Sequence, residues 1–209
     1  MTKSTISNIG IGGVVLFVVA AICGAFLIPG YSQVSNFLSE SYAIDTTYGI
    51  YLRVLGYIPS GLLMLLFCFF AVKHFPKNKV TSIALKGIGL FYGGGTILTG
   101  IFPCDAGCNK EMINPSVAQL IHSLSGLFSY TATPFFVIML GLAALKWKDA
   151  GNTGKSILIC GFVSLVFAVL FFSQLNSPYG GLIQRILEGS ILLSILFTAF
   201  DLKKNYPIS

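Results

Sequence analysis

Long apolar stretches alternate with short polar segments along the whole of this 209-residue chain. The apolar stretches cover about residues 9–29, 50–72, 83–102, 116–145, 156–175 and 182–201. An α-helix needs about 20 residues to cross a hydrocarbon core ~30 Å thick, and each stretch is close to that length. We therefore predict an all-α integral membrane protein, a bundle of six transmembrane helices that forms a single domain over residues 1–209.

Composition supports this class and excludes a nucleic-acid partner. The chain is 55% hydrophobic and 10% charged, whereas a soluble domain carries about 25% charged residues. Its net charge of +6 comes from basic residues in small groups at the ends of the predicted helices. A nucleic-acid-binding protein would instead gather them on one face or along one helix.

The basic residues fall mainly on one side of the predicted bundle. Ten lie in alternate connections and at the termini: Lys3, Lys73, Lys77, Lys79, Lys86, Lys146, Lys148, Lys155, Lys203 and Lys204. Three lie on the other side: Arg53, Lys110 and Arg185. Because short cytoplasmic loops carry the excess of Lys and Arg, we predict that both termini are cytoplasmic. Two termini on the same side of the membrane require an even number of spans, and six is even.

We expect the first apolar stretch to stay in the protein as a membrane helix. It follows Lys3 and contains small residues, as a secretory signal peptide would. Its apolar part is about 20 residues long, however, and a signal peptide has an apolar region of about 7–15 residues.

Two spans contain residues that disturb or tighten helix packing. Pro59 lies near the start of the second span and is expected to kink it. The third span is rich in glycine, and Gly89 and Gly93 form a G-x-x-x-G pair. A phosphate-binding loop would require a preceding strand, so we interpret these glycines as sites of close helix contact.

Cys104 and Cys108 lie in a short loop that we place on the extracytoplasmic side. An oxidising compartment favours a disulfide between them. Metal binding and thiol exchange are the alternatives, and His122 is the obvious third metal ligand. The disulfide is the favoured interpretation, and we predict neither a bound metal nor a cofactor.

The start of the fourth span carries a polar face. Gln119, His122 and Ser123 share it by helical spacing, so this face is expected to point into the bundle. A histidine there can exchange protons near neutral pH. The structural alternative is a histidine that hydrogen-bonds two helices together.

Several charged residues lie at the same predicted membrane level as His122: Glu40, Arg53, Asp105, Arg185 and Glu188. Arg185 and Glu188 are spaced to pair with each other, and Arg185 and Arg53 are also suited to bind a lipid phosphate. If the helices bring these groups together, they form a polar pocket open to the outer leaflet.

Four motifs carry a resemblance to a known family. Residues 35–40 read Ser-Asn-x-x-Ser-Glu, and residues 100–108 read Gly-x-Phe-Pro-Cys-Asp-x-x-Cys. His122 follows early in the fourth span, and residues 181–185 open the sixth. The chain resembles the prokaryotic six-span membrane family known as domain of unknown function 998. The resemblance implies a prokaryotic plasma-membrane location and this fold, and it implies no reaction.

We expect a non-catalytic protein that binds a membrane lipid or another small amphiphile in the outer pocket, and that has a possible membrane-protein partner. The alternative is a lipid-modifying hydrolase or transferase. It would use His122 as acid and base, Asp105 or Glu188 to orient it, and Arg185 and Arg53 to bind phosphate. The nucleophile would be Ser123, Ser125 or a water that His122 activates. No Gly-x-Ser-x-Gly or His-Glu-x-x-His motif supports the enzyme. A transporter would need ionisable groups at mid-membrane and ranks last.

Overall fold

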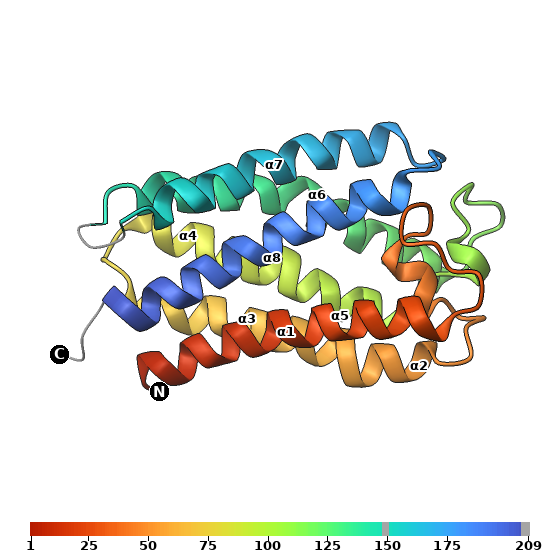
Figure 1. Cartoon of the computed structure of the whole chain (residues 1–209), viewed down its shortest axis with the longest axis horizontal. Coiled ribbons are helices and arrows are strands. Elements are labelled where there is room, and N and C mark those ends of the chain that lie inside the picture. The colour runs from red at the N-terminus through yellow and green to blue at the C-terminus, as the bar shows by residue number, and fades with distance from the viewer. Residues whose placement is uncertain (148–150, 206–209) are drawn as a thin grey trace.

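A computed structural model of the chain describes residues 1–147 and 151–205, and within these ranges all regular structure is helical. The helices run roughly parallel to one long axis (Figure 1). The four longest uninterrupted helices are α1 (Lys3–Leu27), α6 (Val117–Ala144), α7 (Thr153–Ser173) and α8 (Gly180–Asn205). Lys148, one of the ten basic residues assigned to the cytoplasmic side, lies outside the described residues.

Two further rods are each built from several helical segments. The first contains α2 (Gly49–Tyr51), the π-turn η2 (Leu52–Tyr57), α3 (Ile58–Ala71) and the 3₁₀ turn η3 (Val72–His74). The second contains α4 (Lys79–Ile88), the π-turn η4 (Gly89–Gly93) and α5 (Gly94–Ile101). Two short 3₁₀ turns, η1 (Leu38–Tyr42) and η5 (Ala106–Cys108), lie in the connections.

Among the described residues, five helices are long and apolar enough to cross a membrane, which indicates an integral membrane protein. They are Lys3–Leu27, Gly49–His74, Val117–Ala144, Thr153–Ser173 and Gly180–Lys204. The predicted span 83–102 corresponds to α4, η4 and α5. Their lengths are 10, 5 and 8 residues, so none of the three is long enough by itself.

The two ends of the bundle differ in what they contain. The first turn of α1 and the last turn of α8 lie at the same end (Figure 1). The opposite end, called here the loop end, carries the connections 28–48, 102–116 and 174–179.

Glycines let the second and third rods approach closely. A Cβ atom added to Gly61 would lie 2.7 Å from the carbonyl oxygen of Gly93. One added to Gly93 would lie 2.8 Å from the backbone nitrogen of Leu65. The backbones of α3 and η4 are therefore in direct contact, in agreement with the packing role predicted for the glycines of this segment.

The two π-turns direct aromatic side chains into the bundle. Pro59 has no N–H to donate to the carbonyl of Leu55. The wide turn η2 lies just before it, and there the N–H of Ile58 donates to the carbonyl of Arg53, five residues back. Tyr57 in η2 and Tyr92 in η4 are each only 1% exposed. Such turns recur at functional sites, and here both tyrosines line one cavity.

Candidate functional site

A cavity of about 270 Å³ lies inside the loop end of the bundle. Its walls come from α1, η1, η2, η4, α5, η5, α6, α8, the loop end of α7 and the neighbouring loops, and most of the lining side chains are apolar or aromatic. The polar side chains among them include Tyr92, Lys110, Gln119, His122, Ser123, Tyr130, Gln184 and Glu188. An apolar enclosure with a few convergent polar groups is the usual form of a small-molecule site.

Glu188 is the deepest charged group of this cavity. It lies eight residues after Gly180, the first residue of α8, which places it about 12 Å along the helix axis at 1.5 Å per residue. Its side chain is 7% exposed. The hydroxyl of Tyr130 donates to Oε1 at 2.5 Å, and the hydroxyl of Tyr92 bonds to Oε2. Two helices and a π-turn thus converge on one carboxyl group.

His122 lies nearer the loop end, close to the start of α6, and is 9% exposed. Its Nδ1 atom is 2.9 Å from the carbonyl oxygen of Phe102. A carbonyl only accepts, so Nδ1 carries the hydrogen and the neutral ring keeps a lone pair on Nε2. In the described part of the chain, no carboxylate lies within ion-pair distance of this imidazole. The expected pairing of His122 with Asp105 or Glu188 is therefore not formed.

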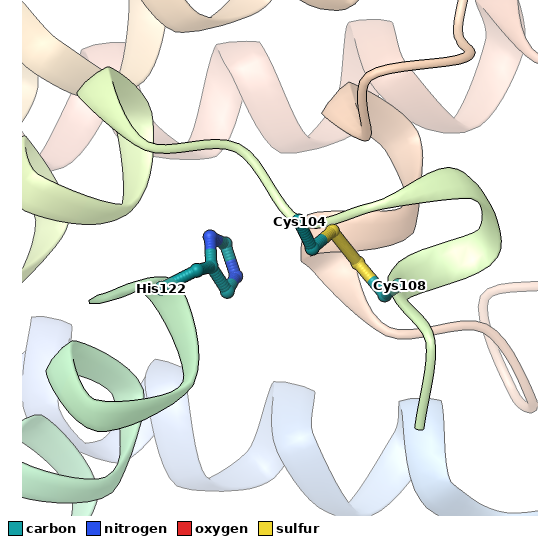
Figure 2. A group of neighbouring side chains, drawn as sticks. All are labelled: Cys104, Cys108 and His122. Carbon is teal, nitrogen blue, oxygen red and sulfur yellow. A yellow bond between two sulfur atoms is a disulfide. The ribbon is translucent and has the colours of Figure 1, made fainter. Parts of the chain in front are cut away.

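Cys104 and Cys108 lie at disulfide-bonding distance, with Cα atoms 4.8 Å apart. Figure 2 shows the imidazole of His122, on α6, beside this loop. The potential ligand atoms of the three residues lie within 4.8 Å of one another. A metal would need both sulfurs as thiolates, and the disulfide removes them. The geometry therefore favours a disulfide over a metal site at these two cysteines.

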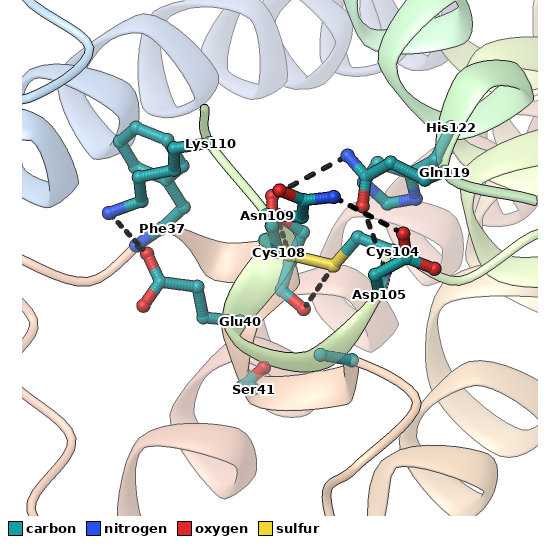
Figure 3. The surroundings of a disulfide bond; sticks show 12 residues. Phe37, Glu40, Ser41, Cys104, Asp105, Cys108, Asn109, Lys110, Gln119 and His122 are labelled. Atoms are coloured by element: carbon teal, nitrogen blue, oxygen red, sulfur yellow. Dashed lines mark hydrogen bonds and ion pairs between the residues drawn. A yellow bond between two sulfur atoms is a disulfide. The ribbon is translucent and has the colours of Figure 1, made fainter. Parts of the chain in front are cut away.

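Asp105 holds this loop against the start of α6. Its Oδ2 accepts the backbone N–H of Ser116 at 3.0 Å. It also accepts a hydrogen bond from the side chain of Asn109 at 3.4 Å (Figure 3). The hydrogen bonds from Ser116 are the main reason that the pKa of Asp105 lies below its ordinary value. Asp105 does not line the cavity, so its role in this geometry is structural.

Gln119 connects the same loop to the cavity wall. Its Oε1 accepts the backbone N–H of Asp105 at 2.8 Å, and its Nε2 donates to Ser123 at 3.0 Å and to the Cys108 carbonyl at 3.4 Å. The amide is 3% exposed and uses both its acceptor and its donors. Gln119 therefore holds the loop that carries Asp105 and Cys108 against the cavity wall.

Arg185 points away from the cavity. Its guanidinium donates to the hydroxyl of Tyr31 at 2.7 Å and to the carbonyl oxygens of Asn36 and Gly181 at 2.9 and 3.0 Å. Although Glu188 lies one turn further along α8, the two residues do not pair. The positive charge instead holds the first loop onto the start of α8.

Glu40 completes this arrangement in the first loop. It forms an ion pair with Lys110 at 2.7 Å and accepts the backbone N–H of Phe37 at 2.9 Å. The side chain of Asn36 donates to its second oxygen at 2.5 Å. Figure 3 shows Glu40 and Lys110 facing each other beside Phe37. We call Tyr31, Asn36, Glu40, Lys110 and Arg185 the loop clamp.

Comparison with known proteins identifies the family. Residues 11–201 match the family described as a protein of unknown function, DUF998. The chain belongs to this family. No curated protein and no solved structure matches it. Membership of DUF998 confirms the resemblance drawn from the loop motifs and His122, and it assigns no reaction.

In this DUF998 protein, the predicted site residues separate into two sets. Gln119, His122, Ser123 and Glu188 line the cavity. Glu40, Arg53, Asp105 and Arg185 are not among its lining residues. Arg53 donates to the carbonyls of Gly49 and Gly100, both at 3.4 Å. The expected convergence of both arginines on a single pocket is therefore absent from the described structure.

Sequence reasoning missed several polar residues of the DUF998 cavity, including Tyr57, Tyr92, Tyr130 and Gln184. A usable signal was present for Tyr92 and Tyr130, because they lie well inside their spans, away from the interfaces where membrane tyrosines are enriched. A phenol so far from water needs an internal hydrogen-bond partner. Glu188 was the available one.

Proposed function

We propose that this protein binds a lipid or another small amphiphile in the loop-end cavity, at the extracytoplasmic face of a prokaryotic plasma membrane. The observation that carries the proposal is the cavity itself, which combines apolar and aromatic walls with a few buried polar groups. An acyl chain suits such walls, and the polar groups suit a head group or another polar end. A membrane-protein partner remains part of this proposal.

The same proposal includes six spans within one domain, with both termini in the cytoplasm. Its support is that α4, η4 and α5 follow one another as residues 79–101 without a break, and that the ends of α1 and α8 lie together (Figure 1). Cysteines placed at Lys77 and at Asn176 test it. Impermeant reagents should label Asn176→Cys in intact cells and leave Lys77→Cys unlabelled; the opposite pattern would reverse the orientation.

A glycine in the cavity wall offers a direct test of ligand binding. Gly126 lines the cavity, and a Cβ atom added there meets no atom within 4 Å. Gly126→Phe should therefore fill the cavity while leaving the helix intact. Gly12→Phe is the matched control, because Gly12 does not line the cavity and its added Cβ meets only Leu63, at 4.0 Å.

The measurement is mass spectrometry of amphiphiles that co-purify with each variant in a neutral detergent. Wild type and Gly12→Phe should carry the same bound molecule, and Gly126→Phe should lose most of it. Equal occupancy in all three proteins would contradict binding in this cavity.

A lipid-modifying hydrolase or transferase is the second candidate. One observation favours it, the lone pair that the Phe102 contact leaves on Nε2 of His122. This enzyme would lack the acidic partner that usually orients a catalytic imidazole. His122→Gln should abolish turnover of a phospholipid substrate if His122 is the base, and it should leave amphiphile occupancy near wild type.

A further inference from the structure

Glu188 lies in a hydrogen-bond network whose direction follows from one backbone donor. The N–H of Leu38 donates to Oε1 of Gln184 at 2.7 Å. The amide nitrogen of Gln184 therefore faces the hydroxyl oxygen of Tyr130, at 2.8 Å. Because Tyr130 accepts from Gln184, its own hydrogen is directed to Oε1 of Glu188. Glu188 is thus an acceptor at Oε1.

This carboxyl group has no cationic partner in the described part of the chain. No Lys, Arg or His lies within 4.0 Å ion-pair distance of it. Arg185, the nearest arginine along α8, is bound to the loop clamp. Buried carboxylates in proteins are ordinarily paired with a cation or a metal, because an isolated charge is costly to desolvate. A cationic ligand would supply the missing charge.

The walls around Glu188 are aromatic. The rings of Phe17 and Tyr57 lie 5.2 Å apart, edge to face, and those of Tyr42 and Tyr57 lie 4.5 Å apart. Tyr130 and Phe171 form another edge contact on the opposite side, at 5.4 Å. All of these rings line the cavity. Aromatic faces attract organic cations and form the usual enclosure for quaternary ammonium groups.

Tyr57 contributes its aromatic ring to the cavity wall. Its hydroxyl is buried beside Ser41, whose own hydroxyl donates to the carbonyl of Leu38. Tyr57 therefore adds an aromatic surface to the site and not a polar contact.

From these contacts we infer that the cavity selects amphiphiles with an ammonium group, which binds beside Glu188 within the aromatic walls. The inference rests on the proposed function, since it names the chemical class of the ligand for the same cavity. The ammonium group belongs either to a lipid head group or to a free organic amine. An anionic head group is disfavoured, because neither Arg53 nor Arg185 lines the cavity, and Lys110, which does, is already paired with Glu40.

The test uses the full chain in a neutral maltoside detergent and matched probes of different charge. Dodecyltrimethylammonium and dodecyl phosphate present opposite charges on the same alkyl chain. Choline and its uncharged carbon isostere dimethylbutanol test for a free amine. Affinities are measured by calorimetry or thermophoresis for wild type, Glu188→Gln and Asp105→Asn, the last being a control because Asp105 does not line the cavity.

The wild-type protein should bind dodecyltrimethylammonium at least about tenfold more tightly than dodecyl phosphate, an advantage of the size expected for a desolvated cation on aromatic faces. Glu188→Gln should remove most of this preference, and Asp105→Asn should keep it. If choline binds as tightly as the alkyl probe while dimethylbutanol does not, the ammonium group is supported and a free amine is its source.

Two negative results have different meanings. If no probe binds and no amphiphile co-purifies, the proposed function itself fails. If the alkyl probes bind regardless of charge, or bind equally to Glu188→Gln, the amphiphile site stands and the ammonium inference is overturned. The charge preference of wild type decides the question even if Glu188→Gln does not fold.

Discussion

Arg185 and Glu188 lie one turn apart on α8, yet they belong to two differently built regions. In the loop clamp, Glu40 is paired with Lys110 and Arg185 donates to three neutral oxygens, so the charged groups find their partners within the protein. In the cavity, Glu188 receives phenolic hydrogen bonds but no cation among the described residues. A region satisfied internally stabilises the fold, whereas one left unsatisfied is suited to a ligand.

The largest expected effect comes from breaking the loop clamp. Arg185→Met keeps most of the apolar stem and removes three charge-assisted hydrogen bonds, which should lower the free energy of unfolding by about 3 kcal/mol. Arg53→Met is the matched control, because both of its hydrogen bonds are long, at 3.4 Å. Reversible unfolding in mixed micelles measures both variants. Equal losses for the two would show that the clamp is not the main constraint on the loops.

Two tyrosines of the cavity should respond differently to loss of the hydroxyl. Tyr130→Phe leaves Oε1 of Glu188 and the amide nitrogen of Gln184 without a partner and should cost about 2 kcal/mol in the same assay. Tyr57→Phe removes a hydroxyl beside Ser41, whose own hydrogen is donated to the carbonyl of Leu38, and stability should change by less than about 0.5 kcal/mol. A large loss for Tyr57→Phe would show that the Ser41 contact holds this hydroxyl in place.

The disulfide should contribute less than the clamp. Replacing both Cys104 and Cys108 by Ser opens a small ring, and the chain-entropy estimate for such a ring is about 2 kcal/mol. The double variant and the reduced wild type should lose the same stability, as measured by unfolding with and without a reducing agent. If the double variant loses stability but reduction leaves wild type unchanged, the serines act through packing and not through the bond.

The smallest effect concerns Asp105 and acid. Its folded pKa lies below the ordinary value because of the bonds from Ser116, so its contribution is complete above about pH 4, the ordinary aspartate pKa. The contribution is then lost as the pH falls through the folded pKa. Asp105→Asn should flatten this part of the stability profile. An unchanged acid slope in Asp105→Asn would assign the effect to other groups.

Much of the fold could be predicted from the sequence, because the energetic cost of burying polar groups in lipid requires long apolar helices. The segment 83–102 was predicted as one span, but the structure interrupts it with the π-turn η4. Hydropathy does not register such a turn, since it changes hydrogen-bond spacing and not composition.

The candidate site was less predictable. Gln119, His122 and Ser123 were found because they share one helical face. Arg185 and Glu188 were placed in one pocket because they lie at one predicted membrane level, and their spacing suggested that they could pair. A spacing of three residues along a helix brings side chains near each other without fixing their partners. Their partners, Tyr31 and Tyr130, are 154 and 58 residues away in sequence. Contacts over such separations depend on the tertiary packing.

The π-turns limit how these helices can change in length. Removing one residue from Gly89–Gly93 would take out the extra residue that the wide turn accommodates, so α4 and α5 would join as one regular α-helix. Tyr92 lies inside this turn, and its hydroxyl would be displaced from Glu188. A single-residue deletion in this segment should therefore remove one hydrogen bond from Glu188 while preserving both the helix content and the hydropathy profile.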